Sequence, residues 1–193
     1  DGTPGQVPQE FAAVLATGND CYAFIVEQVN ATRDVCFRLF APGGSHLDYW
    51  TPARSLAFPA DAPDAFSIAA LDVQAPYPRE DYSSQGPAFG PGGACQGGTV
   101  KPDLAGYANV STNSYGPGVF NGTSAATPHV SGAAAVLWQM LQPTSPAAVQ
   151  SHLESTSLDQ GPVGKDTLTG RGRLFARDLI NGDHIIYLPL MIR

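Results

Sequence analysis

Small and apolar residues fill most positions from 125 to 141, a segment rich in Ala, Val, Leu and Met. This composition favours a helix, and apolar character almost all round predicts burial on most sides of it. The segment stops shortly before Pro143, which cannot continue a helix. We therefore expect a central buried helix over residues 125–141.

Two further helices are predicted after this segment. Ser145 precedes Pro146, the usual pattern of a helix N-cap followed by proline at the first helical position. This helix should run to about Ser155, with Val149 and Leu153 facing inward. A third, short helix is expected over residues 174–179.

Runs of β-branched and aromatic residues predict strands in the first part of the chain. Residues 22–26 and 35–40 are short runs of this kind, bounded by turn residues, and residues 66–71 indicate a buried strand. A loop region rich in Gly and Pro follows over residues 75–98. We interpret residues 1–54 as a β-rich segment, and residues from 55 onward as a mixed α/β unit.

The three cysteines, Cys21, Cys36 and Cys95, show no spacing typical of a metal site or a redox pair. If residues 21–29 and 33–40 form a hairpin, Cys36 lies opposite about Glu27, beyond the reach of a disulfide from Cys21. A bridge between Cys21 and Cys36 is therefore the less favoured pairing. The odd count leaves at least one thiol unmatched within the chain.

The charge of the chain excludes two classes of partner. Its formal net charge is −7, whereas binding to nucleic acid or to an anionic membrane surface requires a basic face. The late apolar run over residues 185–192 contains Pro189 and is too short to cross a bilayer as a helix. We expect a soluble, extracellular protein with neither nucleic acid nor membrane as partner. The chain starts in polar sequence at Asp1, so we expect the natural N-terminus elsewhere.

Ser124 is the candidate for chemistry. It follows Gly122 and lies where the predicted central helix begins. Glycine permits a tight turn, and the first amides of a helix have no intrahelical acceptor, so the Ser124 N–H can donate to a developing oxyanion. The structural alternative is that Ser124 is an N-cap, because serine is among the residues preferred there. Position alone favours the N-cap.

The residues around Ser124 carry a family resemblance. Residues 121–135 read NGTSAATPHVSGAAA, which closely resembles the serine motif of subtilisin-like peptidases, the subtilases. That motif has Gly-Thr-Ser, a variable residue, Ala, a small residue and then Pro-His-Val-Ala-Gly. The resemblance implies that Ser124 is the acylating serine and that its N–H is half of an oxyanion hole. It also implies that Asn121, Gly122 and Thr123 shape the turn and the substrate edge.

The resemblance extends on both sides of the motif. Residues 82–87 are similar to the Ser-Ser-Arg-Gly-Pro loop of the family, and residues 101–104 to its Lys-Pro-Asp-Ile segment. Together with residues 170–174, these matches cover residues 55 to about 180. The family fold is a three-layer α/β sandwich with a mainly parallel sheet. We therefore expect its C-terminal part over residues 55–182, the end of an insertion over 1–54, and a short apolar tail over 183–193.

The family's other catalytic segments are missing from this chain. A serine needs a base and an acid that orients the base, yet neither the Asp-Thr-Gly nor the His-Gly-Thr-His segment of the family occurs here. His129 belongs to the serine motif, and we expect it to be buried and structural. His46 could be imagined as a substitute base, but its loop has no family counterpart. His152 and His184 are expected to face solvent.

Asn19 superficially resembles the oxyanion asparagine of the family, with an ordinary turn as the alternative. No acidic cluster resembles a calcium loop, so the metal and cofactor content stays open although structural calcium is common in the family.

Two functions follow as hypotheses. The first is a secreted serine endopeptidase that cleaves polypeptides through Ser124, of which this chain is an inactive fragment without the triad Asp and His. The missing N-terminal part of the same domain would be its partner. The alternative is a non-catalytic binding or structural module of subtilase descent. The intact serine motif favours the first hypothesis, and the missing triad segments motivate the second.

Overall fold

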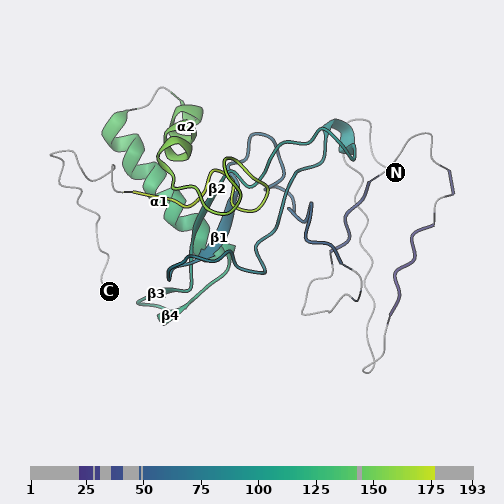
Figure 1. The fold of residues 1–193 in the computed structure, drawn as a ribbon, viewed down its shortest axis with the longest axis horizontal. Coiled ribbons are helices and arrows are strands. Elements are labelled where there is room, and N and C mark those ends of the chain that lie inside the picture. The colour runs from purple at the N-terminus through teal and green to yellow at the C-terminus, as the bar shows by residue number, and fades with distance from the viewer. Residues whose placement is uncertain are drawn as a thin grey trace.

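The computed structural model describes residues 22–27, 29–30, 36–40, 48, 50–142 and 145–176 (Figure 1). Its elements, in chain order, are β1 (Ile68–Asp72), the short 3-10 helix η1 (Pro91–Gly93), β2 (Leu104–Ala108), β3 (Val110–Thr112), β4 (Gly116–Phe120), α1 (Thr123–Leu141) and α2 (Pro146–Thr156). The loop region predicted over residues 75–98 contains only η1 and isolated bridges.

The sheet beneath α1 is a parallel pair. β1 and β2 run in register from the Ile68–Leu104 pair to the Asp72–Ala108 pair. The strand predicted at 66–71 is thus confirmed as β1, two residues shorter at its start. β2 escaped prediction because Leu104–Ala108 contains a glycine and no β-branched residue. A parallel strand pair covered by helices gives the α/β class that we expected.

The outer edge of β2 is covered by the chain's own later residues. Ala105 N–H donates to the Gly172 carbonyl and Leu174 N–H donates to the Ala105 carbonyl, both at 2.8 Å. This segment belongs to the yellow-green part of the chain in Figure 1. It ties the Gly-x-Gly sequence at residues 170–172 to the sheet.

The main core lies between the sheet and the two helices. It is a cluster of buried side chains comprising Leu104, Val130, Leu137, Val149, Leu153 and Leu174. The second predicted helix is confirmed as α2, with Ser145 as its N-cap: the serine hydroxyl accepts a hydrogen bond from the Ala148 N–H. Val149 and Leu153 are its buried residues, as the sequence predicts.

The burial predicted for α1 is wrong on one face. The buried residues are those that face the sheet and α2, including Val130 and Leu137, whereas His129, Ala135 and Trp138 are exposed. Trp138 keeps 47% of its surface accessible. The reason is that the described part of the chain supplies a packing layer to only one side of this helix. Its other side presents small and apolar residues to solvent.

The strands predicted near the N-terminus are not found. The described residues 22–27 and 36–40 form no strand, and Phe24, Ile25 and Phe37 are exposed. A strand needs a partner for its backbone, and these residues have none within the described chain. Residues 174–176, the start of the predicted third helix, are also not helical; the remainder of that helix lies outside the described residues.

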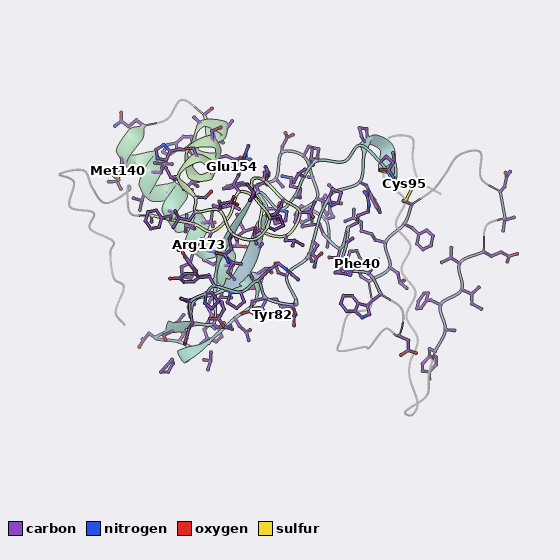
Figure 2. The ribbon with its side chains drawn as sticks, in the orientation of Figure 1. Phe40, Tyr82, Cys95, Met140, Glu154 and Arg173 are labelled. Carbon is purple, nitrogen blue, oxygen red and sulfur yellow. A yellow bond between two sulfur atoms is a disulfide. The ribbon has the colours of Figure 1, made fainter. Side chains whose placement is uncertain are left out.

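A disulfide joins Cys36 to Cys95 (Cys95 is labelled in Figure 2). This agrees with the sequence analysis, in which a Cys21–Cys36 bridge is the less favoured pairing. Nearby, the Arg38 guanidinium pairs with Asp61 and lies 4.3 Å from the centre of the Phe89 ring. Residues 36–40 are thus attached to the loop region by a covalent bond, an ion pair and a cation–π contact.

Candidate functional site

A sharp turn connects β4 to α1 and carries the serine motif. Gly122 is the N-cap of α1, with φ 85° and ψ 168°, and no side chain caps the helix. This backbone conformation is almost confined to glycine. Ser124 is therefore the second residue of α1, and the interpretation of Ser124 as an N-cap is wrong.

The Ser124 side chain is exposed, and its hydroxyl has no hydrogen-bond partner among the described residues. The carbonyl of Gly122 accepts from the Ala125 N–H at 3.0 Å and from the Ala126 N–H at 3.3 Å. The Thr123 and Ser124 amides come before these first helical bonds, so they lie at the positive end of the helix dipole. A carbonyl oxygen that gains negative charge beside Ser124 would find a favourable potential there.

Small residues fix the start of α1 against the sheet. Ala125 and Ala126 have no accessible surface and pack with Ala70 of β1 and Ala108 of β2. Gly106 of β2 lies so close to the helix that a Cβ atom there would be 2.3 Å from the Ala126 carbonyl oxygen. The turn before Ser124 therefore sits on a rigid base beside the carboxyl-terminal halves of two parallel strands.

The β3–β4 hairpin leads directly into the turn. Val110 pairs with Phe120, and the Phe120 ring stacks on Tyr115 with the centroids 4.7 Å apart. The Ser111 hydroxyl accepts from the Gly118 N–H at 2.9 Å. Asn121 and Thr123 follow this hairpin with exposed side chains. The structure thus brings Asn121, Gly122, Thr123 and Ser124 together at one exposed corner.

Tyr82 is a neighbour of this corner for which the sequence analysis predicts no individual role. Its hydroxyl oxygen accepts a hydrogen bond from the Gly122 N–H at 3.0 Å. Burial raises the pKa of Tyr82, the charges of Glu80 and Asp72 add to this, and the Gly122 N–H opposes it. The only signal in the sequence was its place at the start of the matched 82–87 loop.

His129 is exposed rather than buried, which corrects the expectation for this residue. Its Nδ1 atom lies 2.8 Å from the Ala125 carbonyl oxygen one turn earlier, and its ring meets the Tyr107 ring edge-on. The exposure has the same cause as that of the rest of this helix face. The imidazole is therefore bonded to the backbone of its own helix.

The remaining candidates of the sequence are not brought to the corner. His152 lies on α2 and is half-buried. His46, His184 and Asn19 lie outside the described residues.

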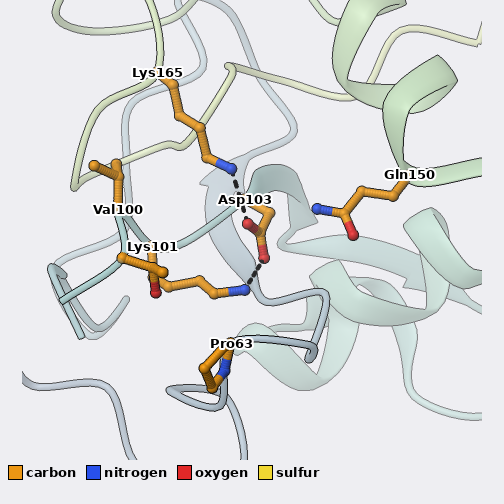
Figure 3. Close-up of a pocket in the computed structure, with 7 residues that line it drawn as sticks. Pro63, Val100, Lys101, Asp103, Gln150 and Lys165 are labelled. Carbon is orange, nitrogen blue, oxygen red and sulfur yellow. Dashed lines mark hydrogen bonds and ion pairs between the residues drawn. The ribbon is translucent and has the colours of Figure 1, made fainter. Parts of the chain in front are cut away.

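The amino-terminal ends of β1 and β2 carry a separate charged cluster (Figure 3). Asp103 accepts from the Lys101 ammonium at 2.6 Å and from the Lys165 ammonium at 2.9 Å. Its carboxylate also accepts from the Ser67 N–H and hydroxyl. The side chains of Asp103 and Lys101 are each 3% exposed.

These contacts set the ionisation of Asp103. Burial alone raises the pKa of Asp103, but the hydrogen bonds from Lys101, Ser67 and Lys165 outweigh it and lower the pKa below its ordinary value. A cavity of about 350 Å³ borders the cluster, lined partly by Gln150. Because every charged group here has a partner inside the cluster, the arrangement holds strands and loops together rather than presenting a reactive group.

The described residues contain neither a metal-binding cluster nor a membrane-spanning helix. They contain no group of three or more His, Cys, Asp or Glu side chains that could hold a metal ion. Within the same residues, neither helix has the length and apolar character needed to cross a bilayer.

Comparison with known proteins places the chain in a family. An extracellular serine protease of Serratia marcescens is 41% identical over 86 residues, which are 45% of this chain and 8% of that protein. Alkaline elastase YaB of Bacillus sp. (strain YaB) is 31% identical over 120 residues, which are 62% of this chain and 28% of that protein. The solved structure of sphericase has 29% identity and a TM-score of 0.49, covering 63% of this chain and 43% of that chain.

The chain thus spans less than a third of the length of these two sequence relatives. The model of the subtilase family matches residues 5–172, which is most of the 193 residues. The chain belongs to the subtilase family.

Proposed function

We propose that this chain is the serine-bearing part of a secreted serine endopeptidase that hydrolyses peptide bonds by acyl transfer through Ser124. The observation that carries the proposal is the corner itself: an exposed serine at the second position of α1, directly after a glycine turn. In the reaction, Ser124 Oγ bonds to the substrate carbonyl carbon and loses its proton to a base. The oxyanion that forms accepts a hydrogen bond from the Ser124 N–H. The peptide C–N bond then breaks, the amine leaves with that proton, and water releases the acyl group from Ser124 as a carboxylic acid.

The three residues before Ser124 have a role in substrate binding in this proposal. Asn121, Gly122 and Thr123 would form the edge along which a polypeptide substrate lies. The names of the Serratia relatives, which are called extracellular, support secretion of this protein as well.

The proposal assigns the triad Asp and His to an N-terminal part of the same catalytic domain that lies upstream of this chain. The absence of both family segments from the sequence supports this. So does α1, on which the described chain leaves the large apolar side chain of Trp138 47% exposed. A sheet of two strands is also marginal by itself. We further propose that residues 55–182 are the C-terminal part of that domain and that residues 1–54 end an insertion.

A fluorophosphonate probe, which reacts with activated serines, tests the proposal on the longest natural form of the protein. We expect labelling that disappears in Ser124→Ala and persists in Ser131→Ala, which changes an exposed serine on the same helix. The 193-residue chain alone should show negligible turnover of a denatured protein substrate. A folded full-length protein that takes no label would contradict the peptidase and favour a non-catalytic binding module.

A further inference from the structure

The loop that carries Tyr82 is attached to the outer edge of β1. Asp72 N–H donates to the Pro78 carbonyl at 2.9 Å, and Glu80 N–H donates to the Ala70 carbonyl at 3.0 Å. Together these bonds lay residues 78–80 alongside the strand. The loop is therefore anchored to the sheet.

The loop is also closed on itself. The buried Ser83 accepts from the Ala70 N–H through its hydroxyl at 3.0 Å and donates its own N–H to the Glu80 carbonyl at 2.9 Å. The Arg79 guanidinium donates to the carbonyls of Glu80 and Ser83 at 2.9 and 2.7 Å. Tyr82 sits inside this turn, so its backbone is held on both sides.

Asn109 connects the same loop to the end of β2. It has a φ of 56°, and its side-chain amide donates to Asp72 at 2.9 Å and to Glu80 at 2.7 Å. The Asn109 amide thus reduces the repulsion between the carboxylates of Asp72 and Glu80. It also joins the ends of β1 and β2 to the loop. Asparagine tolerates this left-handed backbone better than most residues.

Tyr82, held in this way, accepts the hydrogen bond from the Gly122 N–H, 40 residues later in the sequence. Gly122 has no side chain to cap α1, and its carbonyl is already bonded to the first-turn amides of Ala125 and Ala126. The helix therefore holds the Gly122 carbonyl, and the Tyr82 hydroxyl holds the Gly122 N–H. Ser124 lies two residues further on.

We infer that Tyr82 is a positioning residue: its hydroxyl holds the Gly122 backbone so that the Ser124 N–H and Oγ are aligned for acyl transfer. The inference rests on the proposed function of Ser124. It adds a residue outside the serine motif to the machinery of that site. Small shifts in the alignment of a nucleophile and an oxyanion donor lower the rate of the chemical step.

The test uses the longest natural form of the protein with Tyr82→Phe, which removes only the hydroxyl. Tyr22→Phe is the matched control, because the two residues are similarly exposed, Tyr22 to 52% and Tyr82 to 48%. We expect Tyr82→Phe to lower kcat about threefold to tenfold, the worth of one hydrogen bond, while KM and the unfolding temperature stay near those of the control. Amide hydrogen exchange at Gly122 should become faster in Tyr82→Phe alone.

The outcomes separate the two claims. If the parent protein is labelled by the fluorophosphonate on Ser124 and Tyr82→Phe keeps the kcat of the control, the positioning role is overturned and the peptidase stands. Unchanged exchange at the Gly122 amide would overturn it as well, independently of activity. A folded parent that takes no label would overturn the proposed function, and the role of Tyr82 with it.

Discussion

Gly106 of β2 and Ala126 of α1 are in direct backbone contact, with no room for a side chain between them. A Cβ atom at position 106 would lie 2.3 Å from the Ala126 carbonyl oxygen and 3.1 Å from its Cα. Because Ala126 is in the first turn of α1, this contact sets the height of the helix start above the sheet. Gly106 is thus a packing requirement of the serine corner.

The substitution Gly106→Ala should destabilise the longest natural form of the protein by about 2 kcal/mol, because α1 has to move away from β2. The control is Gly132→Ala in α1, where an added Cβ atom has nothing within 4 Å. Alanine is the better helix former, so this variant should be neutral or slightly more stable. Denaturant unfolding measures both; equal stability of the two variants would contradict the close contact.

The sequence predicted the helices far better than it predicted what covers them. α1 and α2 follow from local patterns, and the Ser145 cap is visible in the chain itself. The exposed face of α1 could not be foreseen, because burial depends on which layers pack against the helix. Likewise, an aromatic or β-branched run such as 22–26 predicts a strand only if a partner lies beside it.

The serine corner was predicted as a sequence motif, and the structure adds contacts between distant residues. The bond from Gly122 to Tyr82 and the packing of Ala125 against Ala70 join residues tens of positions apart. Residue spacing along the chain carries no signal for such contacts. The Cys36–Cys95 pairing stayed open for the same reason, since three cysteines allow several choices.

Asp103 should govern the stability of the chain in acid. Its pKa is lowered in the folded protein, so its contribution is complete above about pH 4, the pKa of an unfolded aspartate, and is lost as pH falls through the lower folded value. Asp103→Asn leaves the buried Lys101 ammonium without its charged partner and should cost about 3 kcal/mol at neutral pH.

The difference in free energy of unfolding between the parent and Asp103→Asn should therefore shrink between pH 5 and pH 2. The exposed Asp81 provides the control, since Asp81→Asn removes a carboxylate at the surface. Denaturant titrations at several pH values give the curves. A difference that stays constant with pH would show that ionisation of Asp103 does not carry the effect.

The Cys36–Cys95 disulfide should protect residues 36–40 against proteolysis rather than support the serine corner. Among the described residues, Cys95→Ser leaves the Arg38 contacts with Asp61 and Phe89 to hold this segment. We expect faster cleavage by an added protease within residues 36–40, located by mass spectrometry, while fluorophosphonate labelling of the full-length protein is retained. Loss of labelling together with unchanged proteolysis would show instead that the disulfide supports the serine corner and does not protect residues 36–40.

Gly122→Ala should reduce the reactivity of Ser124 in two ways. Alanine strains a backbone with φ 85° and ψ 168°, at a cost of about 1–3 kcal/mol. In addition, the new methyl group would lie 3.6 Å from the Ser124 N and 4.0 Å from its Oγ, where the substrate carbonyl has to approach. We expect labelling by the fluorophosphonate to fall at least about tenfold in the longest natural form.

Gly164→Ala separates strain from crowding. Gly164 has nearly the same φ, 87°, but an added Cβ there has nothing within 4 Å. This variant should lose comparable stability and keep the labelling rate of the parent. If Gly164→Ala lost labelling to the same extent as Gly122→Ala, the effect would come from general destabilisation. If Gly122→Ala alone loses it, the conformation and open space at residue 122 are requirements of the reacting serine itself.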